Sequence, residues 1–549
     1  MRSVMASLRI AVLVGLALLP VPVAAAPGDP APPTAPEAPA PDDDPVTARM
    51  RAALERPVAP EPAAPTEPTA GPRLEWSGLV SSDVRYVVIP KSDLVAGTRQ
   101  TLIDYGFARN DNVLKLKPTA TLSPHVRAHA NVDFVLRGFS EADTLGDLSR
   151  RERTDPFYLR TYALYVEVNE VLPGLDLRVG RQVVTWGASD AFSPLNVANA
   201  RDFDNALLFG DPIGTDMLRI DYAPADWLRA TAVAIPVFRP GLIPPSARLG
   251  LGTADRIRIQ GDRFRRELAM LVALGPPKEI TVAVERPVAL AEDVAAGARV
   301  QTRVLDIDLA ALYFRGHFDL PSPTRSVTST ADDGTRTTAV TLGFPRFQLA
   351  GLELSSELPF GPRPGLWADV ALYFPEEARL SLETPGMFSG EIREAADGSL
   401  SLDGTGARPV VVPSRPFPKW TVGADVTLFH HLYVNLQWAH GFLDEYGSGL
   451  EVRRVAFGTS PEVTWDRIGD YLVAGGDLKL LSDQLLLRVF GIWKVGHATG
   501  IGFPQVSWLG WDGVDLSVGA FLLLGDENTK FGDPAAGGSQ AFARATLSF

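Results

Sequence analysis

Apolar and polar residues alternate one by one along many short stretches of this sequence. Between His125 and Arg137, every even-numbered position is apolar, and every odd-numbered position except Val135 is polar. A period of two places successive side chains on opposite faces of a β-strand. The last stretch, Ser539 to Phe549, alternates in the same way with Phe542 as its exception, and it ends on an aromatic residue. The pattern predicts a chain of strands that each have one apolar and one polar face.

Eighteen segments either show this alternation or lie between residues that are typical of turns. The expected strands are 74–88, 112–122, 126–139, 158–168, 175–186, 215–223, 227–237, 294–303, 305–316, 346–358, 366–374, 416–429, 432–442, 468–481, 484–495, 500–508, 514–524 and 539–549. Many alternating segments of about ten residues, separated by turn residues, are typical of a transmembrane β-barrel. The predicted fold is therefore all-β, an antiparallel transmembrane barrel of about 18 strands, with 16 as the alternative.

The lengths of the connections alternate as well. Short turns are expected at 123–124, 224–226, 430–431 and 482–483, and long connections at 89–111, 187–214, 238–293, 317–345, 375–415 and 443–467. Short periplasmic turns opposite long extracellular loops are typical of outer-membrane barrels. The piece 256–275 fits no strand, and its role is left open between a helix and a plug element.

The amino-terminal 72 residues have a different composition. Arg2 and Arg9 precede an apolar run that ends near Leu19, and small residues follow, which predicts a signal peptide over 1–25. Residues 26–72 are rich in proline and alanine and predict a disordered periplasmic arm with a short helix near 45–56. No later apolar run reaches the length of a membrane-spanning helix. The barrel is expected to occupy 73–549.

Composition narrows the chemistry. The chain has no cysteine and a net charge of −13, which argues against thiol chemistry and against a nucleic-acid partner. Its seven histidines lack the neighbouring acidic or histidine partners that a metal site needs. No nucleophile motif or paired-carboxylate motif is found. The sequence thus predicts no enzyme activity, no catalytic residue, no metal site and no cofactor.

The densest motif is Gly180-Arg-Gln-Val-Val-Thr-Trp-Gly187, followed by Asp190-Ala-Phe-Ser-Pro-Leu-Asn196 and Asn199-Ala-Arg-Asp202. Gly187 permits a sharp exit from a strand that is expected to rise to Trp186. The following segment has many loop formers, yet Phe192, Leu195 and Val197 need burial. This combination predicts a loop that folds back into the barrel.

The motif resembles the signature of an uncharacterised family of proteobacterial outer-membrane β-barrels, a domain of unknown function with porin-like members. The family pattern ends in Asn-Pro-x-Asp, and Ala200 here replaces the proline. The terminal strand ending in Phe549 also resembles the closing strand that the barrel-assembly machinery reads in outer-membrane barrels. These resemblances imply a porin-like barrel in the outer membrane of a Gram-negative bacterium.

Within a barrel, the alternation assigns inward-facing positions. The candidates for the lumen or its constriction are Arg127, Asp133, Arg137, Asp176, Arg178, Gln182, Trp186, Asp190, Asn196, Asp202, Arg488 and Lys494. Such charges could line a solute path and set its selectivity. They could equally neutralise one another and hold a wide barrel rigid. Arg181 falls on the opposite face from Gln182, which predicts either a bulge or a position above the lipid band.

The function hypothesis is a channel for an unidentified small or amphipathic solute, with a lipid-like solute included. The alternative is a structural or anchoring barrel with a blocked lumen, which holds an envelope complex through its arm. The expected partners are outer-membrane lipid, the barrel-assembly machinery and a periplasmic protein that contacts residues 27–72.

Overall fold

The computed structural model describes residues 72–549 except 96–97, 143, 190–191, 205–209, 243–278, 289, 380, 384–390, 395–399, 404–409, 413, 443–467, 497, 527–528 and 533–536. The predicted signal peptide, the arm with its short helix, and segment 256–275 therefore lie outside the described residues. Within the described part, no helix has the length and apolarity that crossing a bilayer requires.

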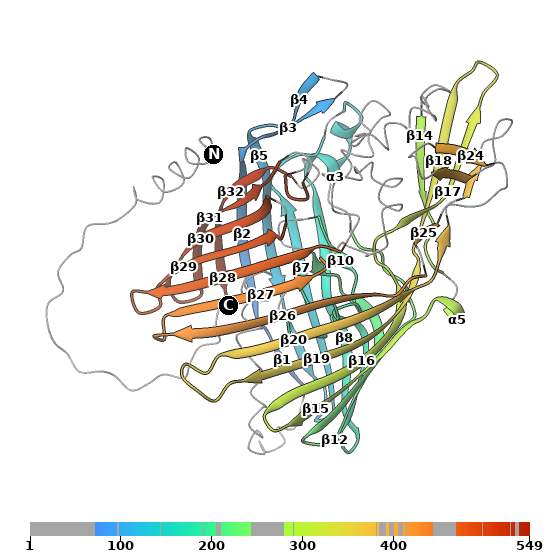
Figure 1. Ribbon diagram of the computed structural model, residues 1–549. Coiled ribbons are helices and arrows are strands. Elements are labelled where there is room, and N and C mark those ends of the chain that lie inside the picture. Colours follow the sequence, from blue (N-terminus) through green and yellow to red (C-terminus); the bar gives the residue numbers. More distant parts are fainter. Residues whose placement is uncertain are drawn as a thin grey trace, which may run out of the picture. The chain divides into compact units, whose positions relative to one another are not determined.

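The described chain forms one closed antiparallel β-barrel (Figure 1). Its wall consists, in order, of β2 (Gly78–Ile89), β5 (Gly106–Leu116), β7 (Val126–Arg137), β8 (Phe157–Leu172), β9 (Leu175–Gln182), β12 (Thr215–Ala225), β13 (Leu228–Ile235), β15 (Ala295–Val304), β16 (Ile307–His317), β19 (Arg346–Glu357), β20 (Gly365–Pro375), β26 (Phe417–Leu428), β27 (Leu432–His440), β28 (Asp470–Leu480), β29 (Leu485–Lys494), β30 (Thr499–Trp511), β31 (Val514–Leu524) and β32 (Ser539–Ser548). β32 pairs back onto β2 and closes the ring.

Two further strands lengthen the wall. β1 (Arg73–Glu75) comes just before β2 in the chain, and β6 (Thr119–Thr121) comes just after β5. The two short strands pair with each other and extend the β2–β5 pair at one end. Of the twenty strands in the sheet, eighteen therefore stand side by side as the wall. The predicted count of eighteen is confirmed, and the alternative of sixteen is not.

The remaining elements lie in the connections. They are β3 (Lys91–Val95), β4 (Thr98–Ile103), η1 (Asp147–Ser149), α3 (Arg151–Thr154), β10 (Arg201–Asp202), β11 (Asp211–Pro212), β14 (Glu279–Val284), α5 (Leu290–Asp293), β17 (Ser322–Thr330), β18 (Arg336–Gly343), β21 (Ala378–Arg379), β22 (Ser381–Glu383), β23 (Glu391–Glu394), β24 (Leu400–Asp403) and β25 (Val410–Val412). β14, β18, β17 and β22 form a sheet of their own that pairs with no wall strand.

Each of the eighteen predicted strands corresponds to a wall strand, with two notable differences in extent. β5 begins at Gly106, whereas the prediction begins at 112, because Ala108 forms a bulge where the pairing shifts between Arg85 and Tyr86. β9 ends at Gln182 and does not reach Trp186. The expected short turns are present, and several require left-handed backbone, as at Leu481, Ser482 and Asp483 between β28 and β29.

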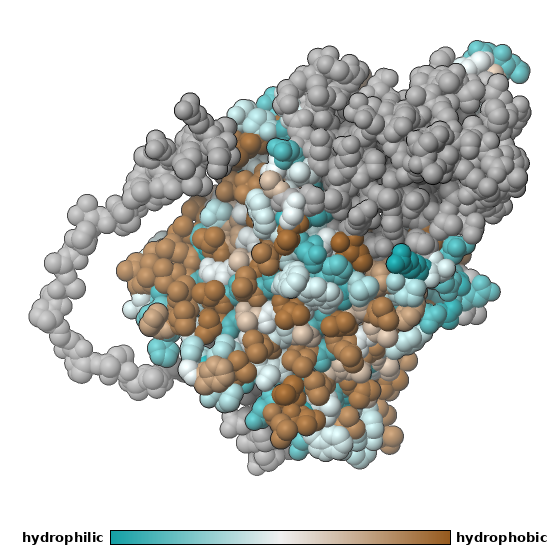
Figure 2. Space-filling model, in the orientation of Figure 1, coloured by the Kyte–Doolittle hydropathy of each residue, from teal (hydrophilic) through white to brown (hydrophobic). Residues whose placement is uncertain are grey.

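The outer face of the wall is apolar, as a barrel in contact with lipid requires. On β29, for example, Val489 and Trp493 are 64% and 44% exposed, while the intervening Phe490 and Ile492 are buried inside. Hydrophobic side chains gather over the wall strands on the face shown in Figure 2. A polar exception is a chain of side-chain hydrogen bonds, in which the Ser82 hydroxyl donates to Asn112 Oδ1 and Asn112 Nδ2 donates to Asn110 Oδ1.

Arg181 also points outward. The register between β9 and β12 is regular there and places Arg181 directly opposite Asp216, whose carboxylate its guanidinium binds at 3.0 Å. Of the two alternatives predicted for Arg181, the bulge is therefore wrong. An outward charge is tolerated near the carboxyl end of β9 because it has a carboxylate partner.

Inside the barrel, two groups of buried side chains pack against different parts of the wall. Cluster 1 lies along β27 to β32 and contains Phe192, Ala439, Phe442, Tyr471, Val473, Phe490, Ile492, Ile501, Phe503, Phe521, Leu523, Phe531 and Phe542. Cluster 2 lies along β12 to β26 and contains Val184, Trp186, Leu195, Ala198, Met217, Val233, Ile235, Leu312, Phe314, Phe318, Phe347, Leu349, Ala371, Tyr373 and Phe417. Neither cluster includes a residue of β5, β7 or β8.

Candidate functional site

The loop that follows β9 enters the barrel at Gly187. This glycine has a φ of 104°, which other residues adopt only with strain, and a Cβ atom there would lie 1.9 Å from Ser193 Oγ. The next two backbone N–H groups, of Ala188 and Ser189, donate to the two carboxylate oxygens of Asp369 at 2.9 and 2.8 Å. Asp369 is fully buried on the inner face of β20, so the loop crosses to another part of the wall.

The loop then packs against the far wall through its apolar residues. Phe192 belongs to cluster 1 and contacts Phe442, with ring centroids 5.4 Å apart. The carbonyl of Phe192 accepts a hydrogen bond from Thr421 on β26, and that of Pro194 accepts one from Tyr373 on β20. Leu195 is fully buried in cluster 2. The described contacts thus confirm that this segment packs inside the barrel.

Asn199 brings the loop back to the strands from which it came. Its carboxamide nitrogen donates to the carbonyl oxygens of Gln182 and Ile213 at 3.0 and 2.9 Å. Its carboxamide oxygen accepts from the backbone N–H of Val184 at 2.7 Å. Ala200, which replaces the proline of the family pattern, is buried, and its carbonyl accepts a hydrogen bond from Ile213. One side chain therefore joins the entry and the exit of the loop.

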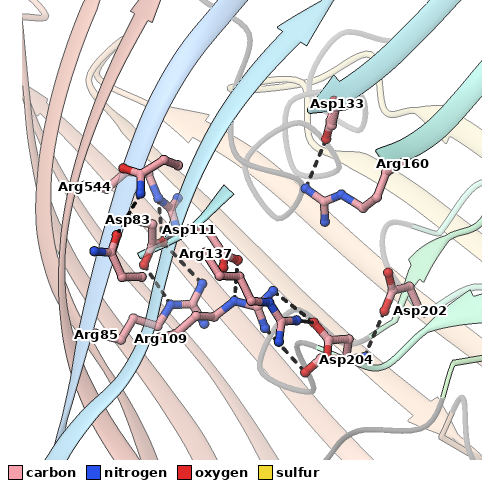
Figure 3. Close-up of polar contacts among 12 residues, drawn as sticks. Asp83, Arg85, Arg109, Asp111, Asp133, Arg137, Arg160, Asp202, Asp204 and Arg544 are labelled. Atoms are coloured by element: carbon pink, nitrogen blue, oxygen red, sulfur yellow. Dashed lines mark hydrogen bonds and ion pairs between the residues drawn. The ribbon is translucent and has the colours of Figure 1, made fainter. Parts of the chain in front are cut away.

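Beyond Asn199, the loop presents a carboxylate to the β5–β7 wall. Asp204 Oδ2 lies 3.0 Å from Arg109 Nη2 and 2.9 Å from Arg137 Nη2 (Figure 3). Both arginines are on the inner face of neighbouring strands. We call Arg109 and Arg137 the arginine clamp. The Asp204 N–H also donates to Asp202 Oδ1 at 2.8 Å, which places a second carboxylate beside the clamp.

The clamp is part of a wider charged wall across β32, β2, β5, β7 and β8. Its members on these strands are Arg85, Arg109, Lys115, Arg137, Arg160 and Arg544, with the carboxylates Asp83, Asp111 and Asp133. Arg85 and Arg109 face each other directly across the β2–β5 pair. Like charges in that position destabilise a sheet, so the carboxylates of the same strands are needed to offset them.

This wall includes buried polar atoms whose hydrogen-bonding capacity is unused within the described part of the chain. Arg137 Nε and Arg160 Nε are buried and have no acceptor among the described residues, and Asn131 Oδ1 has no donor there. Beside Asn131, a polar cavity of about 300 Å³ is lined by Tyr162, Tyr165, Arg178, Gln182 and Pro212, among others. Buried polar groups are nearly always paired with protein, water or ligand. The wall and this cavity are therefore the part of the interior best suited to a polar solute.

Burial shifts the acidity of two carboxyl groups in the connections. Burial raises the pKa of Asp202, against the lowering effect of the Asp204 N–H group and of Arg160 and Arg109. Burial also raises the pKa of Asp319, whose carboxylate accepts a hydrogen bond from the Arg201 N–H at 3.0 Å. Burial disfavours the charged form of a carboxyl group, which is the cause of both shifts.

The predicted site residues fall into separate groups. Asp133, Arg137 and Asp202 lie at the charged wall. Arg178 binds Glu167 at 2.8 Å and lines the polar cavity together with the buried Gln182. Arg127 is an exposed residue of β7, opposite Glu167. Asp176 accepts a hydrogen bond from the Glu170 N–H at the β8–β9 turn, away from the loop.

Other predicted residues are structural or distant. Trp186 is not at the top of a strand. It is buried in cluster 2 beside Phe314, because β9 has already ended. Asn196 contributes its backbone carbonyl to Arg201. Asp190 lies outside the described residues. Arg488 binds Asp477 at 2.5 Å, and Lys494 lies over the Tyr471 ring, on the wall beside cluster 1.

The residues that the sequence did not reveal are Arg109, Arg160, Asp204, Asn199 and Asp369. Arg109 lies within a stretch that the pattern assigned to a connection, because the bulge at Ala108 breaks the alternation. Asn199 stands inside the motif, and an asparagine beside buried loop residues is the signal that could have identified it. Nothing local in the sequence places Asp204 against two other strands.

No family model matches the sequence, and no curated protein matches it. Solved structures match at low identity. OccAB1 of Acinetobacter baumannii is 9% identical and is covered over 96% of its chain and 87% of this one, with a TM-score of 0.44. The outer-membrane channel DcaP of A. baumannii is 10% identical, with coverages of 99% and 88% and a TM-score of 0.38. OpdK of Pseudomonas aeruginosa, solved with vanillate, is 9% identical, with coverages of 98% and 86% and a TM-score of 0.40.

Proposed function

We propose that this protein is a channel in the outer membrane of a Gram-negative bacterium, through which a small polar solute passes along the charged wall. The closed barrel with apolar outer rows supports a place in lipid. The amino-terminal sequence, which resembles a secretory signal, supports export.

One observation carries the proposal. The loop joins apolar clusters along β12 to β26 and along β27 to β32, whereas it meets β5 and β7 through the arginine clamp. Apolar packing between loop and wall closes a path to water, while a contact through charged groups leaves polar surface for a solute. An interior lined by charged side chains is the usual way in which barrels select polar solutes. This favours a polar solute over a lipid-like one.

A specific observation also supports the alternative of a blocked, anchoring barrel. The segment near Phe531 folds inward as well, since the Lys91 ammonium donates to the Gly532 carbonyl at 3.0 Å and Phe531 belongs to cluster 1. Two inserted segments leave less open cross-section than one. In that case the arm would bind a periplasmic partner, and the barrel would conduct no ions.

Ion conductance in planar bilayers distinguishes the two functions. The purified protein should give discrete current steps, and replacing residues 187–214 by a short Gly-Ser linker should enlarge them. Shortening the β17–β18 hairpin is the matched control, because these strands pair with no wall strand, and it should leave the steps unchanged. Absence of current from both the complete and the loop-deleted barrel would rule out the channel.

A further inference from the structure

The arginine clamp holds the Asp204 carboxylate in the way that a binding site holds a carboxylate ligand. Two guanidinium groups from separate strands converge on one carboxylate oxygen, which comes from a different segment of the chain. The side chains of Arg109, Arg137 and Asp204 are only 14%, 26% and 15% exposed. Charge-assisted hydrogen bonds of this kind are the strong ones, and arginine pairs are suited to recognising carboxylates.

The charge of the wall favours an anion at this position. The charged wall has the six cations named above, and the carboxylates that these cations bind outside the in-folded loop are Asp83, Asp111, Asp133 and Glu141. The wall therefore has more positive than negative charges without the loop. The loop supplies negative charge opposite, with Asp204 at the clamp and Asp202 beside it.

The surroundings of the clamp could hold the rest of such a ligand. The Tyr158 ring lies 5.3 Å from the Arg137 guanidinium and 6.0 Å from that of Arg160. Arg137 Nε and Arg160 Nε still have donor capacity, because neither has an acceptor among the described residues. An organic carboxylate would place its charge on the arginines and its carbon body against the tyrosine ring.

We propose that Arg109 and Arg137 form a binding site for the carboxylate of a small organic acid, and that Asp204 occupies this site when no solute is bound. The proposal rests on the channel function and names its solute class. A solute carboxylate takes over the two guanidinium groups and releases Asp204, so the loop leaves the clamp only while a solute passes. Asp204 thus acts as a tethered competitor.

The test measures benzoate binding to the detergent-solubilised protein by isothermal titration calorimetry, with benzamide as the neutral analogue. In D204N the clamp has lost its charged competitor, so benzoate should bind about tenfold more tightly than to the wild type. In D204N/R137Q this gain should disappear. Benzamide should bind none of the variants measurably.

R299Q is the matched control. Arg299 binds Glu353 at 2.8 Å on β15 and β19, away from β5 and β7, so this change removes an inward-facing arginine of similar burial without touching the clamp. Its benzoate affinity should equal that of the wild type. Heat-modifiable migration on gels verifies that each variant is folded, so that a lost affinity is not a lost fold.

The outcomes separate the two proposals. Unchanged or weaker benzoate binding by D204N than by the wild type, equal binding of benzamide and benzoate, or weaker benzoate binding by R299Q than by the wild type would overturn the carboxylate site. Tighter binding of inorganic phosphate than of benzoate would overturn the solute class. Because calorimetry does not need an open pore, a barrel that binds benzoate as expected but conducts no ions would refute the channel function alone.

Discussion

The carboxamide oxygen of Asn199 accepts a hydrogen bond from the backbone N–H of Val184 at 2.7 Å, across fourteen intervening residues of the in-folded loop. The nitrogen of the same group donates to the carbonyl of Gln182 at 3.0 Å. One buried side chain therefore fixes where the loop leaves β9 and where it returns. The position of Asp204 at the arginine clamp depends on this contact, because Asp204 follows Asn199 by only five residues.

Replacing Asn199 with alanine should detach the loop from β9 and β12. The change leaves several buried backbone groups without a partner, and each costs about 1–3 kcal/mol. We expect trypsin to cut the folded variant after Arg201, a half-buried residue in the intact protein. Asn196→Ala is the matched control, because no hydrogen bond involves the Asn196 side chain in the described part of the chain. Equal protease resistance of both variants would contradict the role of Asn199.

Gly187→Ala should raise the conductance of the proposed channel. The residue has a φ of 104°, a conformation that costs a non-glycine residue about 1–3 kcal/mol. The added methyl group would also overlap Ser193 Oγ. We expect a larger single-channel conductance and an unchanged yield of folded barrel. Gly334→Ala has the same left-handed backbone, with a φ of 80° and no atom within 4 Å of the new methyl, so its conductance should match the wild type.

The strands could be predicted from the sequence because each wall residue meets either lipid or the interior, and that choice repeats every two residues. Two apolar residues, Phe542 and Val135, break the alternation in the strongest patterns, and both lie on the inner face of the barrel. Phe542 faces inward and stacks on Phe503 within cluster 1, at a centroid distance of 5.6 Å. Val135 is 1% exposed on the inner face, where an apolar residue replaces the expected polar one.

The candidate site could be predicted only in part. Asp133 and Arg137 were found because they lie on the polar face of a regular strand. Arg109 was missed because a bulge interrupts its strand. The contact of Asp204 joins residues separated by 95 and 67 positions, and no local pattern encodes such a separation. Strand periodicity identifies which side chains face inward, but it does not tell which loop atoms meet them.

Lowering the pH should shift the selectivity of the proposed channel towards anions. Burial raises the pKa of Asp202, so this carboxyl group takes up a proton at a higher pH than an ordinary aspartate does. At a pH above this pKa, the Asp202 carboxylate is negative and repels anions. At a pH below it, the group is neutral, so less negative charge offsets the nearby Arg160 and Arg109. Reversal potentials measured in a KCl gradient between pH 8 and pH 4 should show the shift. D202N should show the low-pH selectivity throughout, and a wild-type titration that persists in D202N would contradict this assignment.

Arg488→Met should destabilise the barrel. Its guanidinium binds the Asp477 carboxylate at 2.5 and 2.7 Å, and the Arg488 side chain is only 4% exposed. Leaving one member of a buried pair uncompensated costs about 3–5 kcal/mol, whereas replacing both members with apolar residues is often neutral. The temperature at which the folded gel band disappears should fall for R488M and recover in R488M/D477L. R363Q breaks an exposed pair with Glu357 and should change this temperature little.

Phe549 gives a test that separates recognition by the assembly machinery from closure of the barrel. Its backbone N–H and carbonyl exchange hydrogen bonds with Gly78, each at 2.9 Å, next to the β2–β32 seam. Phe549→Ala keeps these backbone bonds and removes only the aromatic ring, which is the feature that resembles the signal for barrel assembly. We therefore expect F549A to refold in detergent as well as the wild type but to reach the outer membrane of cells in lower yield.

Leu547→Ala is the control, because Leu547 is an apolar outward residue of the same strand, 50% exposed. Its yield in cells should stay near the wild-type level. Deleting Phe549 also removes the two hydrogen bonds to Gly78, so this variant should lose yield in cells and refold less well in detergent. If F549A assembles normally in cells, the ring is not the signal, and the terminal residue serves only to close the seam.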